Sequence, residues 1–221
     1  MMSPDQHSVQ SAQQRILIAA SEEFVEKGLA GARMQAIANR AGVNKALLHY
    51  YFRSKQRLYE AVFENTLGNI WKEMEKNMAG LDENADVAVI VRTLVSTYLN
   101  TLKDSPAFPR IFLRELADGG DNLRVIINGF IERFGNVIGR VFGVFKRGVQ
   151  QGTLRPIDPV HILINVMGMC AASFILKPVV AQMHEKFQRV PVQFDEKFYA
   201  ARITAITEMA LNGIMAKERR V

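Results

Sequence analysis

The sequence contains a single cysteine, Cys170, so no disulfide can form within the chain. Its first residues, MMSPDQHSVQSA, have neither the basic start nor the apolar core of a secretory leader. Residues 160–176 are apolar but include His161 and Asn165, and they fall short of the roughly 20 residues that a spanning helix needs. These absences predict a cytoplasmic protein with no membrane segment, in which residues 160–176 form a buried or subunit-interface helix.

Acidic residues are absent between Glu26 and Glu60, although seven basic residues lie there: Lys27, Arg33, Arg40, Lys45, Arg53, Lys55 and Arg57. The whole chain has 28 basic and 22 acidic residues, so the remainder has 21 basic against 22 acidic. The positive charge is therefore concentrated in one segment, which suits a surface for a polyanion. Charge alone leaves open a solvated basic face without a partner.

Strand patterns are also missing, because apolar residues recur at helical spacing almost throughout. The sequence therefore predicts an all-α protein. A first helix should end at Gly28, a second begins at Met34 and closes at Gly42, and Asn44 and Ser54 cap a third and a fourth helix. Further helices are expected near 86–103, 107–118, 122–150, 159–176 and 195–216, whereas 177–194 should be partly loop.

Three glycines, Gly135, Gly139 and Gly143, recur every four residues inside a helical segment. Each costs a helix roughly 0.5–1 kcal/mol relative to alanine, so three on one face need a structural reason. Close packing against another helix is the favoured explanation. The alternative is a cavity wall opened by the missing side chains.

Residues 34–52 have the layout of a helix-turn-helix, in which the second helix enters the major groove of DNA. At about 100° per residue, Leu48, Tyr51 and Phe52 fall on an inner side of that helix, which predicts core positions. The outer side holds Lys45, Ala46, His49 and Tyr50, with Leu47 at the boundary. Lys45 can donate to guanine or phosphate, and neutral His49 can donate to phosphate. Lys55, at the start of the fourth helix, would form a phosphate site with free backbone amides.

The segment MQAIANRAGVNKALLHYYFRSKQRL, residues 34–58, resembles the DNA-binding signature of the TetR family of bacterial transcriptional regulators. The resemblance rests on Ile37-Ala38, Ala41-Gly42-Val43, the run from Leu48 to Phe52, and a Lys-x-x-Leu ending that begins at Lys55. It implies a flexible tail over residues 1–12, a three-helix DNA-binding domain over 13–57, and a larger helical ligand-binding and dimerisation domain over 58–221. Arg33 and His49 replace a threonine and a tyrosine common in the family. Ala46-Leu47 replaces Gly-Thr, which favours an apolar contact, for example to a thymine methyl group.

By this resemblance, contacts to bases come from Gln35, Lys45, Ala46, Leu47 and Tyr50, and contacts to phosphates come from Arg33, His49 and Lys55. The resemblance also implies a homodimer formed through the C-terminal helices, with a small-molecule pocket in each subunit. Candidate pocket residues are aromatic or sulfur-containing side chains of the later helices, although such residues more often belong to a core: Trp71, Met74, Phe112, Phe134, Met167, Cys170 and Phe174. The few charges on these helices predict a largely apolar effector.

Taken together, these features predict a ligand-responsive regulator, a repressor that binds a pseudo-palindromic operator as a dimer. An enzyme is disfavoured, because the four histidines are scattered and no zinc helix, phosphate-binding glycine loop or nucleophile elbow is present. No catalytic residue, metal site or cofactor is therefore predicted. The alternative is a DNA-binding regulator without a small-molecule inducer, either responsive to a protein partner or architectural.

Overall fold

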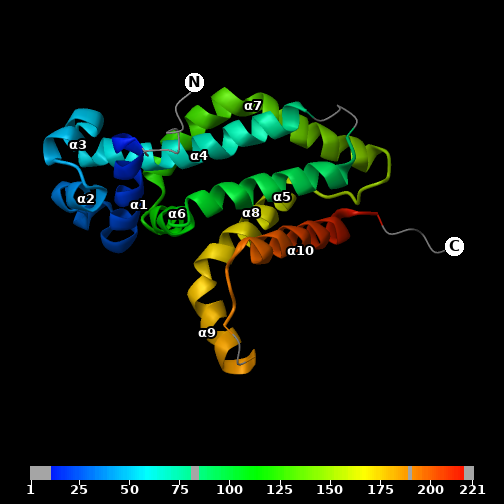
Figure 1. The fold of residues 1–221 in the computed structure, drawn as a ribbon. Coiled ribbons are helices and arrows are strands. Elements are labelled where there is room, and N and C mark those ends of the chain that lie inside the picture. Colours follow the sequence, from blue (N-terminus) through cyan, green and yellow to red (C-terminus); the bar gives the residue numbers. More distant parts are fainter. Residues whose placement is uncertain (1–10, 81–84, 189–190, 217–221) are drawn as a thin grey trace, which may run out of the picture. The chain divides into compact units, whose positions relative to one another are not determined.

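The computed structural model describes residues 11–80, 85–188 and 191–216 of the chain. Apart from one isolated bridge between Leu154 and Met215, this described part is built of helices and their connections. The helices are α1 (Ala12–Gly31), α2 (Met34–Ala41), α3 (Lys45–Phe52), α4 (Lys55–Ala79), α5 (Val87–Asp104), α6 (Phe108–Ala117), α7 (Asp121–Gln150), α8 (Pro159–Ile175), α9 (Lys177–Gln188) and α10 (Glu196–Ile214) (Figure 1). The prediction of an all-α fold is confirmed.

The chain divides into two compact units whose boundaries cut through helices. Unit 1 comprises residues 1–67 and 110–127, and unit 2 comprises residues 68–109 and 128–221. Both α4 and α7 therefore contribute residues to each unit. The predicted division at residue 57 falls inside unit 1, which extends further along α4 and also takes in most of α6.

Unit 1 has a core of aliphatic and aromatic side chains from several helices. Phe24 of α1 is fully buried and meets the ring of Tyr59 edge-on, with centroids 4.9 Å apart. Ile37 of α2 and Leu48 of α3 are also fully buried. Burial of one face of each short helix supplies the stability that such a helix lacks in isolation.

The connection between α2 and α3 is the tight turn expected of a helix-turn-helix. Gly42 adopts a left-handed conformation with φ of 64°, and its N–H donates to the carbonyls of Ala38 and Asn39. The side chain of Asn44 then caps α3 by accepting from the N–H of Leu47 at 2.7 Å. Ser54 caps α4 in the same way through the N–H of Arg57, so both predicted caps are confirmed.

The end of α1 differs from the prediction. Gly28 does interrupt the helix, with φ of 68°, but helical residues continue to Gly31. The guanidinium of Arg114 from α6 lies beside this kink, where a β-carbon on residue 28 would come within 2.7 Å of Nη2. Arg114 also donates to the carbonyl of Val25 at 3.3 Å.

Unit 2 is organised around α5, α8 and α10, which pack on one another. Leu99 of α5, Cys170 of α8 and Ile206 of α10 are fully buried in this layer. The rings of Phe174 and Tyr199 stack between α8 and α10 with centroids 5.5 Å apart. The side chains of Asp158 and Asp195 cap α8 and α10.

One further prediction in this unit is confirmed and another needs correction. The segment expected to be partly loop is helical over Lys177–Gln188 and irregular over residues 191–194. Close packing at the glycines of α7 was the wrong explanation, because a β-carbon added to Gly135 or Gly139 would meet nothing within 4 Å. These glycines instead line a hollow, in agreement with the alternative prediction of a cavity wall.

Within the described residues, no single helix has the length and apolarity needed to cross a membrane. Helices α8 and α9 pass that test only as a pair, and they are bent by 65°.

Candidate nucleic-acid interface

Helix α3 has one buried and one exposed face. Leu48 and Phe52 are buried, whereas Lys45, Ala46 and Tyr50 are exposed, and Tyr50 retains 71% of its accessible surface. The prediction that Tyr51 packs in the core is wrong, since its side chain is 40% exposed and its ring centroid lies 5.5 Å from that of Tyr50. Tyr51 lies at the border of the two faces, so α3 presents a wider exposed surface than a helical wheel suggests.

The other residues predicted to contact bases are accessible to different degrees. Gln35 is exposed on α2, and its amide donates to Asn39 at 2.9 Å, which leaves its oxygen and one N–H available. Leu47 is half-buried on the first turn of α3. Arg33, predicted to contact phosphate, is exposed at the N-cap position of α2 and provides no side-chain cap there.

His49 has a hydrogen-bond partner within the protein, at the end of α3. Its Nδ1 lies 3.3 Å from the carbonyl oxygen of Arg53, so we assign the proton that donates to that carbonyl to this nitrogen. In the neutral ring, Nε2 can then only accept a hydrogen bond. The predicted donation from the neutral ring to a phosphate would use the other tautomer, with the proton on Nε2, which gives up the bond to Arg53.

Lys55 is bonded within the protein at the start of α4. Its ammonium donates to the carbonyls of Ala30 and Ala32 at 2.8 and 3.1 Å, so two of its three donors hold the end of α1. The same residue lines a cavity of about 640 Å³ in unit 1, together with Lys27 and Arg114. The predicted phosphate contact would use the remaining donor and the positive charge.

Some cations of the basic segment are already paired with acids. Arg40 forms ion pairs with Glu22, Glu23 and Glu26 of α1, at 3.5, 3.6 and 3.2 Å. The hydrogen bond from Arg40 is the main cause that lowers the pKa of Glu26. Arg57 pairs with Glu60 on the same helix. Arg40 therefore fastens α2 to α1, and the sequence count of seven cations overstates the charge presented to DNA.

A buried carboxylate joins α4, α6 and α7 inside unit 1. Glu115 is 4% exposed, and its Oε2 accepts a hydrogen bond from the Tyr59 hydroxyl at 2.8 Å. Its Oε1 accepts from the backbone N–H of Asn122 at 3.0 Å, so it also caps the first turn of α7. Asn122 in turn accepts from the amide of Gln56 at 2.7 Å. Burial and the bond to Glu115 raise the pKa of Tyr59 well above its ordinary value.

The seven predicted effector-pocket residues do not form one group in the structure. Phe112 belongs to unit 1 and the other six to unit 2. Trp71 stacks on Phe134 with centroids 5.9 Å apart, and Phe134 stacks on Phe130 at 5.8 Å. Cys170 is fully buried, and burial raises the pKa of its thiol to about 12. Of the remaining residues, two are buried and one is half-buried: Met74, Phe174 and Met167.

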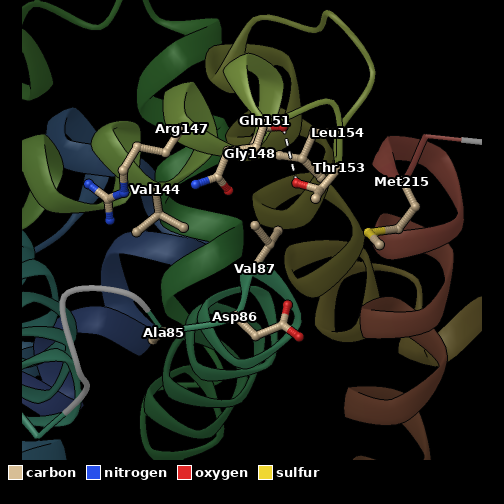
Figure 2. Close-up of a pocket in the computed structure, with 10 residues that line it drawn as sticks. All are labelled: Ala85, Asp86, Val87, Val144, Arg147, Gly148, Gln151, Thr153, Leu154 and Met215. Atoms are coloured by element: carbon tan, nitrogen blue, oxygen red, sulfur yellow. Dashed lines mark hydrogen bonds between the residues drawn. The ribbon is translucent and has the colours of Figure 1, made fainter.

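Two hollows in unit 2 are lined by other residues. One, of about 560 Å³, has the three glycines of α7 in its wall, with Met78, Ile90, Asn136, Arg140, Val144 and Arg147. The second, of about 290 Å³, shares Val144 and Arg147 with it and extends to Asp86 and Met215 (Figure 2). None of the seven predicted residues lines either one. The glycine spacing was the sequence feature that could have located the larger hollow.

The described side chains do not form a metal site, since no three His, Cys, Asp or Glu residues are grouped to hold an ion there. The arrangement with the clearest chemistry is the exposed face of α3 with the neighbouring starts of α2 and α4. It combines lysine, arginine, histidine and tyrosine side chains on a helix-turn-helix scaffold. Such a surface suits a DNA duplex, whose phosphates attract the cations and whose base edges offer hydrogen-bond partners.

Comparison with known proteins agrees with this interpretation. Residues 16–62 match the family described as "Bacterial regulatory proteins, tetR family", and residues 67–217 match "YcdC-like protein, C-terminal region". The HTH-type transcriptional regulator RutR of Escherichia coli (strain K12) is 28% identical over 207 residues, covering 94% of this chain and 92% of RutR. The HTH-type transcriptional repressor NicS of Pseudomonas putida is 26% identical over 162 residues, covering 70% and 72% of the two chains.

Among solved structures, the ketosteroid transcriptional regulator KstR2 of Mycobacterium tuberculosis has a similar fold. Its TM-score is 0.67 at 17% identity, over 95% of this chain and 98% of KstR2. The relatives found by sequence are transcriptional regulators of a family that does not consist of enzymes. Both family matches, together spanning most of the sequence, show that this chain belongs to the TetR family of DNA-binding transcriptional regulators, with a YcdC-like C-terminal region.

Proposed function

We propose that this protein is a repressor that binds a pseudo-palindromic operator as a homodimer and is released by a small molecule. The observation that carries the proposal is the exposed face of α3, where Lys45, Ala46 and Tyr50 project from a helix whose other face is buried. TetR-family regulators bind operators and act as dimers, so two such helices would read two half-sites. NicS, a relative, is named as a repressor. Since its target is DNA, we expect the protein to act in the cytoplasm.

The roles of individual residues follow from where each side chain lies. Gln35, Lys45, Ala46, Leu47 and Tyr50 would contact bases, and Arg33, His49 and Lys55 would contact phosphates. Lys55 would act partly through the fold, because it also holds the carbonyls at the end of α1. The DNA-binding role is assigned to residues 13–57, and effector binding and dimerisation to residues 58–221.

A largely apolar effector remains the favoured class. The aromatic stack of Trp71, Phe134 and Phe130 supplies apolar surface in unit 2. KstR2, similar in fold, is named for ketosteroids. The hollow at the α7 glycines adds Arg140 and Arg147 to its apolar lining. A screening panel should therefore include apolar compounds both with and without an acidic group.

The test of DNA recognition is operator selection from random duplexes, followed by affinity measurements on selected and random DNA. Lys45→Ala and Tyr50→Phe should lower the preference for the operator by about 1–3 kcal/mol for each hydrogen bond to a base that is removed. Lys27→Ala is the control, because Lys27 is an exposed cation of the same segment with no predicted base contact. Unchanged operator preference in both the Lys45 and Tyr50 variants would show that α3 is not the recognition helix.

The alternative is a regulator without a small-molecule inducer. A thermal-shift screen distinguishes the two, since a compound that binds only the folded chain raises its melting temperature. An architectural protein would bind selected and random DNA equally, with affinity falling steeply as salt rises. A partner-responsive regulator would retain operator preference and would release DNA only when a protein is added.

A further inference from the structure

The cavity of unit 1 is lined by three cations, one from each of three helices. They are Lys27 of α1, Lys55 of α4 and Arg114 of α6. One carboxylate, that of Asp118, also lines the cavity, so the charge around it is positive on balance. The volume of about 640 Å³ lies within the roughly 300–1,000 Å³ that is usual for a small-molecule site.

Two of the three cations are held in place by backbone carbonyls. The Lys55 ammonium donates to Ala30 and Ala32 at 2.8 and 3.1 Å, which leaves one N–H for a ligand. The Arg114 guanidinium donates to Val25 at 3.3 Å and has further N–H groups to offer. Because the protein already orders both side chains, an anion that binds them immobilises little additional side-chain freedom.

The kink at Gly28 brings the cations to one short stretch of backbone. Gly28 has φ of 68°, and a β-carbon on this residue would come within 2.7 Å of Nη2 of Arg114. The missing side chain therefore leaves room for the guanidinium against the backbone. Lys27 directly precedes the kink, and Lys55 bonds to Ala30 two residues after it. The three cations thus converge on residues 27–32.

Acidic side chains do not neutralise these cations. Within the described chain, none of the three forms an ion pair, whereas Arg40 and Arg57 of the same unit pair with glutamates. An anion in the cavity would therefore accept charge-assisted hydrogen bonds without displacing an acidic side chain.

The lining favours a phosphate ester as the anion. A phosphate monoester carries about two negative charges at pH 7 and three strong acceptor oxygens, which suits three convergent donors. The Asp118 carboxylate can accept from a hydroxyl group of the same molecule, whereas it would repel the further phosphates of a DNA strand. We infer that this cavity binds the phosphate group of a small hydroxyl-bearing metabolite and is a second effector site, in unit 1.

Binding at this cavity would act on DNA through Lys55, a step that rests on the phosphate contact proposed above for that residue. Its one remaining N–H cannot serve a bound phosphate ester and an operator phosphate at the same time. The metabolite should therefore lower the affinity for the operator.

The first test measures binding to the full chain without DNA. Isothermal titration calorimetry at constant ionic strength uses glucose 6-phosphate as the ligand and glucose as the uncharged control. Lys27→Gln and Arg114→Gln should each raise the dissociation constant for glucose 6-phosphate about tenfold, as expected when a hydrogen bond between charged groups is lost. Arg110→Gln is the matched control, because Arg110 is exposed on α6 and does not line the cavity, and its dissociation constant should be nearly unchanged.

Circular dichroism checks that the variants fold, and Lys27 is exposed, so its replacement tests the site even if Arg114→Gln unfolds the chain. No binding of glucose 6-phosphate by the wild type, or equal dissociation constants in the wild type and Lys27→Gln, would overturn the inference.

Operator binding distinguishes a metabolite phosphate from a DNA phosphate. Glucose 6-phosphate should lower the operator affinity of the wild type at constant ionic strength, and should do so less in Lys27→Gln. Binding of the ester without any effect on operator affinity would refute the effector role. If the wild type ignores the ester while Lys27→Gln weakens operator and random DNA equally, the cavity holds a backbone phosphate and the inference is wrong. A chain that binds the ester but shows no operator preference would refute the proposed repressor and leave the site standing.

Discussion

Replacing Tyr59 with phenylalanine should lower the free energy of unfolding by about 1.5–3 kcal/mol at pH 7, the usual contribution of a hydrogen bond to a charged group. The Tyr59 hydroxyl donates to Glu115 Oε2 at 2.8 Å, and Glu115 is buried. Without that donor, the remaining partner of Oε2 among the described residues is the side-chain amide of Asn122, at 3.3 Å. The backbone N–H of Asn122 still donates to Oε1. The Glu115 carboxylate therefore loses one hydrogen bond but keeps others.

The effect of this substitution should depend on pH in a defined direction. Burial and the bond to Glu115 raise the pKa of Tyr59, which favours the protonated form in the folded chain. An unfolded tyrosine releases its proton near pH 10, whereas folded Tyr59 keeps its proton at that pH. Above pH 10 the release of this proton on unfolding therefore lowers the free energy of unfolding of the wild type, and the phenylalanine variant has no such proton to release. The stability difference between the two proteins should be constant below about pH 9 and should shrink by about 1.4 kcal/mol at pH 11.

Urea unfolding between pH 7 and pH 11, followed by the fluorescence of Trp71 and by circular dichroism, measures both effects. The matched control is Tyr50→Phe, which removes a hydroxyl from a largely exposed side chain and should leave stability unchanged. Curves for wild type and Tyr59→Phe that stay parallel from pH 8 to pH 11 would refute the assignment of a shifted Tyr59 proton. Equal stability at pH 7 would refute the contribution of the buried bond.

Three further predictions concern residues with well-defined surroundings. Gly28→Ala should lower the free energy of unfolding by about 1–3 kcal/mol, because a φ of 68° strains any residue other than glycine. Adding Arg114→Ala should recover part of this loss, because it removes the guanidinium that would lie 2.7 Å from the new β-carbon. Gly139→Ala should raise stability in urea titrations by about 0.5–1 kcal/mol, whereas Gly148→Ala should lower it, because its β-carbon would lie 2.7 Å from Leu154. Cys170, with a pKa raised to about 12, should react with thiol reagents at pH 8 only after unfolding, and rapid labelling of the folded chain would contradict its burial.

Much of the fold could be predicted from local sequence features. Asn44 and Gly42 fixed the bounds of α2 and α3, because capping and left-handed turns depend on residues only a few positions apart. The partners of Arg40 and Lys55 could not be predicted in that way. Both lie on a basic segment by sequence, but their contacts reach acids and carbonyls of α1, which only the packing of helices brings close. The same holds for the glycines of α7. Their spacing indicated a packing surface or a cavity wall, but the residues that lie opposite them could not be predicted from the sequence.

The effector site was the least predictable part from sequence. Aromatic and methionine residues at helical spacing fill a core or line a pocket equally well, and here Met74 and Phe174 are buried. Arg140 and Arg147 line the larger hollow of unit 2, although the sequence predicted an apolar effector site from other residues of these helices.

The ion pairs of Arg40 and Arg57 have a consequence for how operator affinity should respond to ionic strength. Affinity for duplex DNA falls with the logarithm of salt concentration at a slope of about −0.9 per phosphate neutralised. If all seven cations of the segment in each subunit neutralised a phosphate, the slope for a dimer would be about −13. If only the five that are not paired with acids in the described chain did so, the slope would be about −9. The internal pairs therefore predict an operator affinity that falls less steeply as salt rises, with a larger share of that affinity expected from contacts with base edges.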